Sequence, residues 1–282
     1  MVENRPFVTV LTHAVLIFGA AIVIFPVYLA FIASTHGPGD FLTGVVPLLP
    51  GPHLIDNYAR MLTSGSSTAG APPLWLMLVN SLVMALAIAI GKIAISILSA
   101  YAIVYFRFPF RLLAFWIIFI TLMLPVEVRI LPTFKVVADL GMLNSYAGLV
   151  IPLIASATAT FLFRQFFMTV PDELMEAARV DGAGPMTFFR HILVPLSVNN
   201  IAALFVILFI YGWVQYLWPM LVTTDQRYYT IVMAIKRLAA EADQDPQWNL
   251  VMATAILAML PPVVVVVAMQ RLFVKGLTET EK

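Results

Sequence analysis

Apolar residues along the chain fall into six long runs, each separated from the next by a polar or proline-rich stretch. The runs cover roughly residues 11–33, 75–104, 112–131, 146–168, 200–222 and 250–270. A run of about 20 mostly apolar residues is long enough to cross the hydrocarbon core of a bilayer as a helix. Continuous apolar runs favour helices over barrel strands, because strands of a barrel alternate apolar and polar positions. The pattern therefore predicts an all-α polytopic membrane protein with six transmembrane helices.

Composition agrees with a membrane protein and excludes several other classes. Apolar residues make up 61% of the chain and charged residues 11%, against about 50% and about 25% in soluble proteins. A net charge of +1 without a basic cluster gives no reason to expect nucleic acid as a partner. The chain has no cysteine, and its four histidines lack ligand spacing, so no metal site is predicted.

The first apolar run, 11–33, is interpreted as an uncleaved transmembrane helix. It is longer than the apolar region of a signal peptide, which spans about 7–15 residues, and no small-residue cleavage site follows it. The segment 34–73 is rich in Gly, Pro, Ser and Thr, with helical periodicity only around 55–62. We expect this segment to form a long external loop that is partly ordered, within one membrane domain covering residues 1–282.

The distribution of Lys and Arg predicts the orientation of the six spans. With both termini in the cytoplasm, nine basic residues lie inside: Arg5, Arg107, Arg111, Arg164, Arg179, Arg190, Arg271, Lys275 and Lys282. Six lie outside: Arg60, Arg129, Lys135, Arg227, Lys236 and Arg237. The excess is small, but the short loop 105–111, YFRFPFR, is a clear cytoplasmic signal.

The longest charged stretch between two spans is the loop 169–195, which predicts a helix, a glycine corner and a second helix. Thr169 followed by Asp172 resembles a capping box at the start of the first helix. Gly182 is expected to end that helix in the left-handed conformation. Pro185 suits the first turn of a second helix that runs to about Val194.

Small residues on the first of these helices suggest a docking surface. Leu174, Ala177 and Ala178 are spaced i, i+3, i+4, so we expect them on one helix face that another protein can approach closely. The alternative is a solvated amphipathic connector without a partner.

Two polar residues in the second span and one at the end of the third are candidates for lining a transport pathway. Asn80 and Lys92 lie within the second span, with Lys92 about 18 Å of helix from its cytoplasmic end. A charge inside a membrane is a functional hypothesis by default, and the alternative is a lysine paired within the bundle. Arg129 stands at the outer end of the third span, where it suits an anionic solute; the alternative is a pair with Glu127.

The fifth span contains the run YGWVQYLWP, in which Tyr211 and Gln215 share a helix face at i, i+4. We regard that face as a further candidate for pathway lining. The alternative is an interfacial belt, which Trp and Tyr commonly form near the end of a span.

The loop also carries a motif that resembles a known family. Glu176-Ala177-Ala178, then Gly182, Ile192 ten residues later and Pro195, resembles the EAA signature of ATP-binding cassette (ABC) importer permeases. Val194 departs from the leucine usual in that family. The runs FRFPFR, TLMLPVEVRI and YGWVQYLWP resemble the carbohydrate-uptake permeases of the maltose-transporter type. ENRP, ASATATFLFRQFFMTVPDEL and MQRLFVKGL look closest to the permeases of sn-glycerol-3-phosphate importers.

The resemblance implies a type I importer permease fold in the bacterial inner (cytoplasmic) membrane, with a cytoplasmic coupling helix. The implied partners are membrane lipid, a second permease subunit, two copies of an ATP-binding subunit and a periplasmic solute-binding protein. Seven residues would dock on the ATP-binding subunit: Glu176, Ala177, Ala178, Asp181, Gly182, Ile192 and Pro195.

The function implied is import of sn-glycerol-3-phosphate, with glycerophosphodiesters as further solutes. Alternatives are a permease of the same fold for a sugar or disaccharide, or a stand-alone secondary transporter. Neither G-x-x-x-x-G-K-[ST] nor G-x-G-x-x-G occurs in the chain. We therefore expect a non-catalytic subunit that binds no cofactor, while partner subunits use ATP and Mg.

Overall fold

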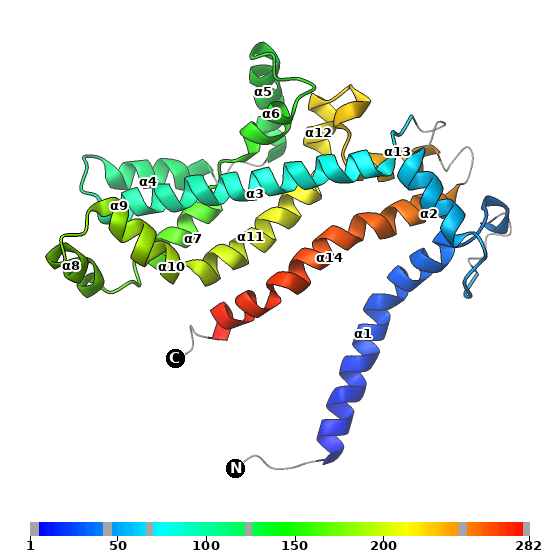
Figure 1. Ribbon diagram of the computed structural model, residues 1–282, viewed down its shortest axis with the longest axis horizontal. Coiled ribbons are helices and arrows are strands. Elements are labelled where there is room, and N and C mark those ends of the chain that lie inside the picture. The colour runs from blue at the N-terminus through cyan, green and yellow to red at the C-terminus, as the bar shows by residue number, and fades with distance from the viewer. Residues whose placement is uncertain (1–5, 42–46, 66–69, 122–125, 242–246, 279–282) are drawn as a thin grey trace. The chain divides into compact units, whose positions relative to one another are not determined.

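The computed structural model describes residues 6–41, 47–65, 70–121, 126–241 and 247–278, and it builds them from helices joined by turns (Figure 1). The prediction of an all-α fold is confirmed for these ranges. The chain forms two compact units, Met1–Met77 with Met233–Leu260, and Leu78–Val232 with Pro261–Lys282. Their boundaries fall within α3 (Leu74–Tyr105), α13 (Ile231–Glu241) and α14 (Trp248–Thr278). Boundaries between domains usually fall in linkers, whereas these boundaries fall inside helices, so they do not decide whether the chain has one domain or two. The single membrane domain stays a prediction.

The first unit contains α1 (Pro6–Ser34), the short η1 (Pro38–Phe41) and α2 (Leu54–Thr63). Apolar side chains of α1 are exposed over most of its length, as expected for a helix that faces lipid. The side-chain amide of Asn57 donates hydrogen bonds to the carbonyls of Ser34 and His36, at 2.9 Å each, and accepts one from Asn249. These bonds order the described part of the predicted external loop, and α2 lies where periodicity predicted a helix.

The core of the second unit forms where α3 packs against several short helices. These are α5 (Val126–Asp139), α6 (Tyr146–Val150) and α12 (Leu217–Val222). Their buried side chains form one cluster: Met84, Ile88, Ile130, Val137, Leu149, Trp218 and Val222. The indole N–H of Trp218 is satisfied inside this cluster by the carbonyl of Gly148, at 3.1 Å.

A glycine brings α3 very close to α11 (Val198–Trp213). A Cβ atom added at Gly212 would lie 2.9 Å from the Cα atom of Ala85, closer than real Cβ atoms approach. Small residues of this kind let two membrane helices pack backbone to backbone. The contact sets which α11 side chains face the middle of α3.

Three of the six predicted spans are single helices long and apolar enough to cross a membrane: Phe7–Ser34, Leu74–Tyr105 and Trp248–Gln270. The predicted span 146–168 is a bent pair, in which Tyr146–Leu153 meets Ala157–Phe167 at 46°. Pro152 lies in the 3₁₀ turn η3 (Ile151–Leu153), and Ser156 starts the next helix by accepting a hydrogen bond from the N–H of Ala159. Proline and a cap residue thus divide this span.

The predicted span 200–222 is also interrupted, so its prediction as a single helix is wrong in detail. In this run, α11 ends at Trp213 and α12 starts at Leu217. Pro219 accounts for this break, because in a continuous helix its ring would clash with the carbonyl of Gln215. The predicted span 112–131 contains α4 (Arg111–Ile120) and the start of α5, and residues 122–125 between them lie outside the described residues, so its continuity stays a prediction.

Candidate functional site

Residues 171–196, here called the coupling segment, form the helix, corner and helix that the sequence predicted. The first helix is α8 (Asp172–Val180). The second element runs from Pro185 to Leu196 as α9 (Pro185–Phe188), the π-helical η4 (Phe189–Leu193) and α10 (Val194–Leu196). Figure 1 shows α8 and α9 beside the C-terminal end of α3, away from α5, α6 and α12.

Gly182 forms the corner, as predicted. Its φ angle is +75°, a left-handed conformation that glycine adopts at little cost. The N–H of Gly182 donates to the carbonyl of Arg179 at 3.0 Å, and the N–H of Ala183 donates to that of Ala178 at 2.8 Å. This pair of bonds is a Schellman motif, which satisfies the last carbonyls of α8 and fixes the angle at which the chain leaves it.

The predicted capping box at the start of α8 is wrong. The hydroxyl of Thr169 donates to the carbonyl of Phe166 at 2.7 Å, and the residue before α8 is Pro171, which makes no side-chain cap. Thr169 follows directly on α7 (Ala157–Phe167), whose final carbonyls lack helical partners and attract the hydroxyl. Asp172 remains in the first turn of α8, where the helix dipole favours negative charge.

The predicted docking face is divided between an inner and an outer side of α8. Ala178 is only 5% exposed, whereas Ala177 and Glu176 are exposed. Successive helical residues point about 100° apart, so Ala177 and Ala178 face different neighbours. The outer side is completed by Val180, which is 88% exposed and lies one turn after Glu176. The sequence analysis missed Val180, although its i, i+4 spacing from Glu176 could have identified it.

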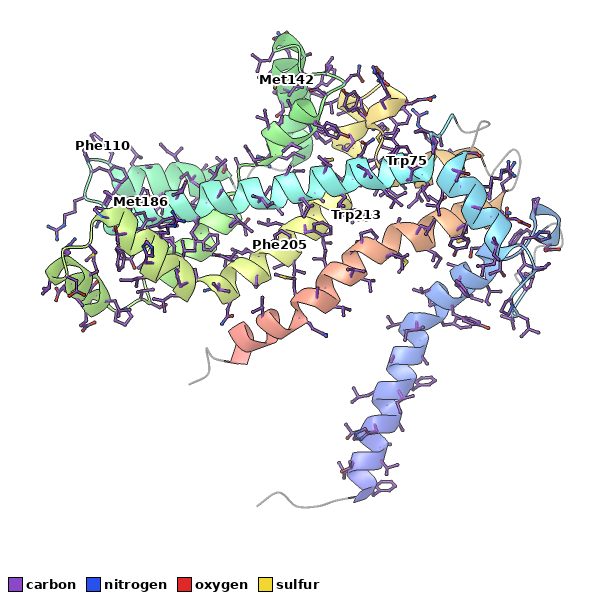
Figure 2. The ribbon with its side chains drawn as sticks, viewed as in Figure 1. Trp75, Phe110, Met142, Met186, Phe205 and Trp213 are labelled. Carbon is purple, nitrogen blue, oxygen red and sulfur yellow. The ribbon has the colours of Figure 1, made fainter. Side chains whose placement is uncertain are left out.

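The remaining predicted docking residues lie on both sides of the corner. Asp181 and Pro195 are exposed, as is Gly182, and Ile192 is half-buried. A second apolar side chain that the sequence analysis missed, Met186 on α9, is 64% exposed (Figure 2). Val180 and Met186 are large exposed apolar side chains on either side of the Gly182 corner, so they are candidates for contact with another protein.

Aromatic residues at the end of α3 hold the coupling segment in place. The hydroxyl of Tyr101 donates to the carbonyl of Pro185 at 2.7 Å, and its ring centroid lies 4.8 Å from that of Phe189. Tyr105, one turn later, has its ring centroid 5.3 Å from that of Phe188. These contacts connect α9 and η4 directly to α3. These contacts were not predicted from the sequence, although the i, i+4 spacing of Tyr101 and Tyr105 places both rings on one face of the helix.

A pocket of about 880 Å³ lies between α8 and the end of α3. Arg107, Arg111 and Arg179 line it together with Asp172 and Glu176. Ala178, Tyr101, Tyr105 and Phe188 form part of its wall. The pocket thus extends from Ala178 on the inner side of α8 to Glu176, and Val180 is not among its lining residues.

The coupling segment continues into α11 through a bend of 72°. Ser197 lies at this bend and is fully buried, and its hydroxyl donates to the carbonyl of Leu193 at 2.6 Å. The second half of the coupling segment is thus joined to α3 through the two tyrosines and to α11 through this bend.

The pathway candidates fall in two separate places. Asn80 is fully buried, and its amide donates to the carbonyls of Arg227 and Tyr229 while accepting from the hydroxyl of Tyr146 at 2.6 Å. All of its polar groups are thus engaged by the protein, which favours a structural role. Lys92 lies about 18 Å further along α3.

Lys92 and Tyr211 come together. The Lys92 Nζ lies 3.7 Å from the centroid of the Tyr211 ring, a cation–π contact. Gln215 lies beyond the end of α11, so its predicted helical face is wrong, yet its side-chain amide donates to the carbonyl of Tyr211 at 3.0 Å. Arg129 is exposed on α5. The Glu127 side chain, its alternative partner, lies outside the described residues.

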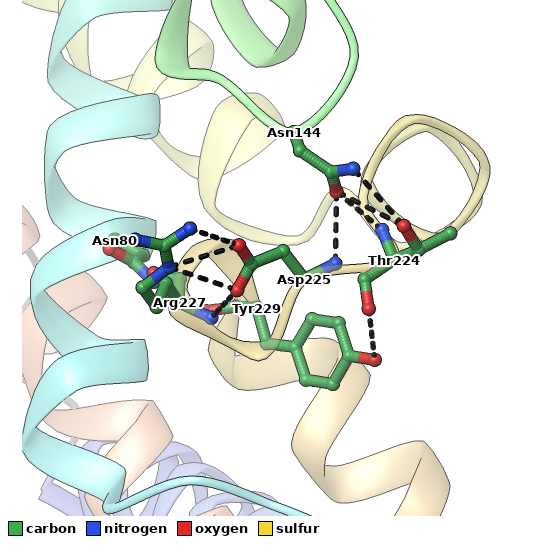
Figure 3. Close-up of polar contacts among 6 residues, drawn as sticks. All are labelled: Asn80, Asn144, Thr224, Asp225, Arg227 and Tyr229. Atoms are coloured by element: carbon green, nitrogen blue, oxygen red, sulfur yellow. Dashed lines mark hydrogen bonds and ion pairs between the residues drawn. The ribbon is translucent and has the colours of Figure 1, made fainter.

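Asn144 joins the α5–α6 turn to the segment after α12 (Figure 3). Its side-chain oxygen accepts from the backbone N–H groups of Thr224 (2.7 Å) and Asp225 (2.9 Å), and its amide donates to the Thr224 hydroxyl. Arg227 pairs with Asp225 at 2.6 Å, and its hydrogen bonds lower the pKa of that half-buried carboxyl. The sequence analysis missed this cluster because it joins residues 80 positions apart.

Asn144→Ala is expected to destabilise the purified protein by about 1–3 kcal/mol, because two backbone N–H groups, one exposed and one partly buried, lose their acceptor. The φ angle of Asn144 is +53°, so alanine adds about 1 kcal/mol of left-handed strain. Unfolding in detergent would measure both effects. Asn144→Gly should avoid the strain but still lack the hydrogen bonds. A wild-type melting curve for Asn144→Ala would contradict the role given to the Asn144 side chain.

The comparisons with known proteins identify the family. The profile of the binding-protein-dependent transport system inner membrane component matches residues 92–279. The sn-glycerol-3-phosphate transport system permease protein UgpE of Agrobacterium fabrum is 61% identical over the full length of both chains. Proteins of that name from Rhizobium meliloti and Escherichia coli O1:K1 are 58% and 57% identical, again over both full lengths.

A solved structure shows the fold. It is described as a bacterial ABC transporter involved in the import of the acidic polysaccharide alginate, and it matches with a TM-score of 0.79 at 20% identity. The match covers 96% of this chain and 98% of that one. The chain therefore belongs to the family of binding-protein-dependent transport system inner membrane components, with the fold of an ABC-importer permease.

Proposed function

We propose that this chain is a permease subunit of an ATP-driven importer that carries sn-glycerol-3-phosphate, and also glycerophosphodiesters, across the bacterial inner membrane. The observation that carries the proposal is 61% identity over the whole of both chains to a permease named for that solute. The coupling segment supports it, because an exposed helix with a rigid corner is what a mechanical link to a separate ATPase needs.

The partners follow from the same proposal. They are a second permease subunit (UgpA-like), two copies of an ATP-binding subunit (UgpC-like) and a periplasmic solute-binding protein (UgpB-like). Glu176, Ala177 and Val180 form the exposed side of α8 and would enter a groove of the ATP-binding subunit, with Met186 at the edge of the contact. Both termini would then lie in the cytoplasm.

The mechanism is the transmission of a movement. This chain has no nucleotide-binding fingerprint, so energy from ATP would reach it through α8. The Schellman corner would carry a displacement of α8 into α9, the tyrosines of α3 would receive it there, and the bend at Ser197 would pass it to α11. Since α3 and α11 hold Lys92 and Tyr211, the displacement would reach the middle of the membrane. Nucleotide binding in the ATP-binding subunit would then shift the equilibrium between an inward-facing and an outward-facing arrangement of these helices.

Reconstitution of the four components in proteoliposomes tests the proposed function. We expect uptake of radiolabelled sn-glycerol-3-phosphate that requires both ATP and the binding protein, and little uptake of maltose. A matched preparation with a hydrolysis-deficient ATP-binding subunit should take up no solute. Uptake of maltose in place of sn-glycerol-3-phosphate, or uptake that persists without ATP, would contradict the proposal.

A further inference from the structure

Lys92 is a buried cation without an anionic partner among the described residues. Its exposure is 7%, and its ammonium nitrogen lies 3.7 Å from the centroid of the Tyr211 ring. The ion pairs among the described residues do not include Lys92. Burying an ammonium group is costly unless an anion or several hydrogen bonds compensate for the lost water.

Helices pack closely on either side of this contact. A Cβ atom added at Gly91 would lie 2.7 Å from a side-chain carbon of Ile154, so the residue before Lys92 is pressed against the start of the bent span. Gly212, the residue after Tyr211, is pressed against α3 at Ala85. Both residues thus stand next to a glycine at which helices pack closely, and these contacts fix where the two side chains start.

We propose that Lys92 forms the buried end of a binding site for the phosphate group of the transported solute. The inference rests on the proposed function and adds to it a residue that recognises the charge of the solute. A phosphate ester brings the anion and the acceptor oxygens that the Lys92 ammonium group lacks. Tyr211 holds the ammonium group in position between transport cycles.

The stability of a charge-neutral variant separates this role from a structural one. If Lys92 serves the fold, Lys92→Met should lower the melting temperature (Tm) of the purified complex by several degrees. If Lys92 awaits a solute anion, Lys92→Met removes an uncompensated buried charge and should melt no lower than wild type. Methionine is close to lysine in length and is apolar, so it leaves no large cavity.

Transport measured on the same preparations completes the test. We expect Lys92→Met to copurify with the ATP-binding subunit and to reduce sn-glycerol-3-phosphate uptake roughly ten-fold or more, as the loss of a charge-assisted contact implies. Lys92→Arg should retain a large part of the uptake. Lys135→Met is the matched control, because Lys135 is an exposed lysine on α5, and it should transport like wild type. Full uptake by Lys92→Met, or lost uptake together with a lowered Tm, would overturn the inference.

A wrong solute assignment and the absence of an anion site at Lys92 give different results. If the wild-type complex imports no sn-glycerol-3-phosphate, the solute assignment fails, and inorganic phosphate becomes the probe for the site. A rise in wild-type Tm with phosphate over chloride at equal ionic strength, absent in Lys92→Met, would support an anion site. Equal shifts in both proteins would overturn it.

Discussion

Gly182→Val is expected to reduce ATP-driven uptake at least ten-fold while leaving the chain folded in the membrane. Valine is β-branched and strongly disfavours the left-handed φ of +75° found at this corner, at a cost of about 1–2 kcal/mol. No atom lies within 4 Å of a Cβ built at Gly182, so the effect would come from the backbone and not from a clash. The corner would open and α8 would leave α9 at another angle. Uptake in proteoliposomes, with the amount of assembled complex as reference, measures this effect.

Gly184 is the matched control for this prediction. It lies two residues away, also has open space around its Cβ position, and has an ordinary φ of −71°. Gly184→Val should therefore transport nearly as well as wild type, and Gly182→Asn should recover much of the activity, because asparagine tolerates the left-handed region. Equal losses for Gly182→Val and Gly184→Val would show that the left-handed corner is not the reason.

Glu176→Lys is expected to release the ATP-binding subunit from the complex during purification. Reversing a charge at a close interface contact costs several kcal/mol, about 2–5 for a buried pair, which is enough to lower affinity more than ten-fold. The ratio of ATP-binding subunit to permease after affinity purification measures the loss. Glu173→Lys provides the control, since Glu173 is exposed on the same helix one turn earlier. Retention of the subunit by both variants would contradict the docking role of Glu176.

The parts of this fold that the sequence predicted depend on local physics. The long apolar runs identified α1, α3 and α14, and glycine after a helical pattern identified the left-handed corner at Gly182. The predictions failed where a polar side chain had two possible partners, and where a proline interrupted the helix several residues before its own position. Thr169 bonds back to α7, which its spacing from Asp172 could not reveal. Pro219 interrupts a run that composition alone makes continuous.

The candidate site also combines features that the sequence could predict with features that depend on tertiary packing. Lys92 and Tyr211 could each be singled out as a polar group in an apolar span, but their contact depends on Gly212 packing against α3, a tertiary feature. Asn80 looked equivalent to Lys92 in sequence. The structure surrounds Asn80 with backbone carbonyls from a segment about 150 positions away, which no local pattern encodes. Ala178 turned inward because the end of α3 covers one side of α8.

The central claim is that the outer side of α8 contacts a separate ATP-binding subunit, and a cross-link from Val180 tests it most directly. The chain contains no cysteine, so Val180→Cys supplies a single thiol on an 88% exposed position. With a single thiol at the groove of the ATP-binding subunit, we expect a disulfide-linked heterodimer whose yield changes when ATP is added. A Val180→Cys thiol that forms no such link, and instead reacts with a membrane-impermeant maleimide from outside intact cells, would contradict the account.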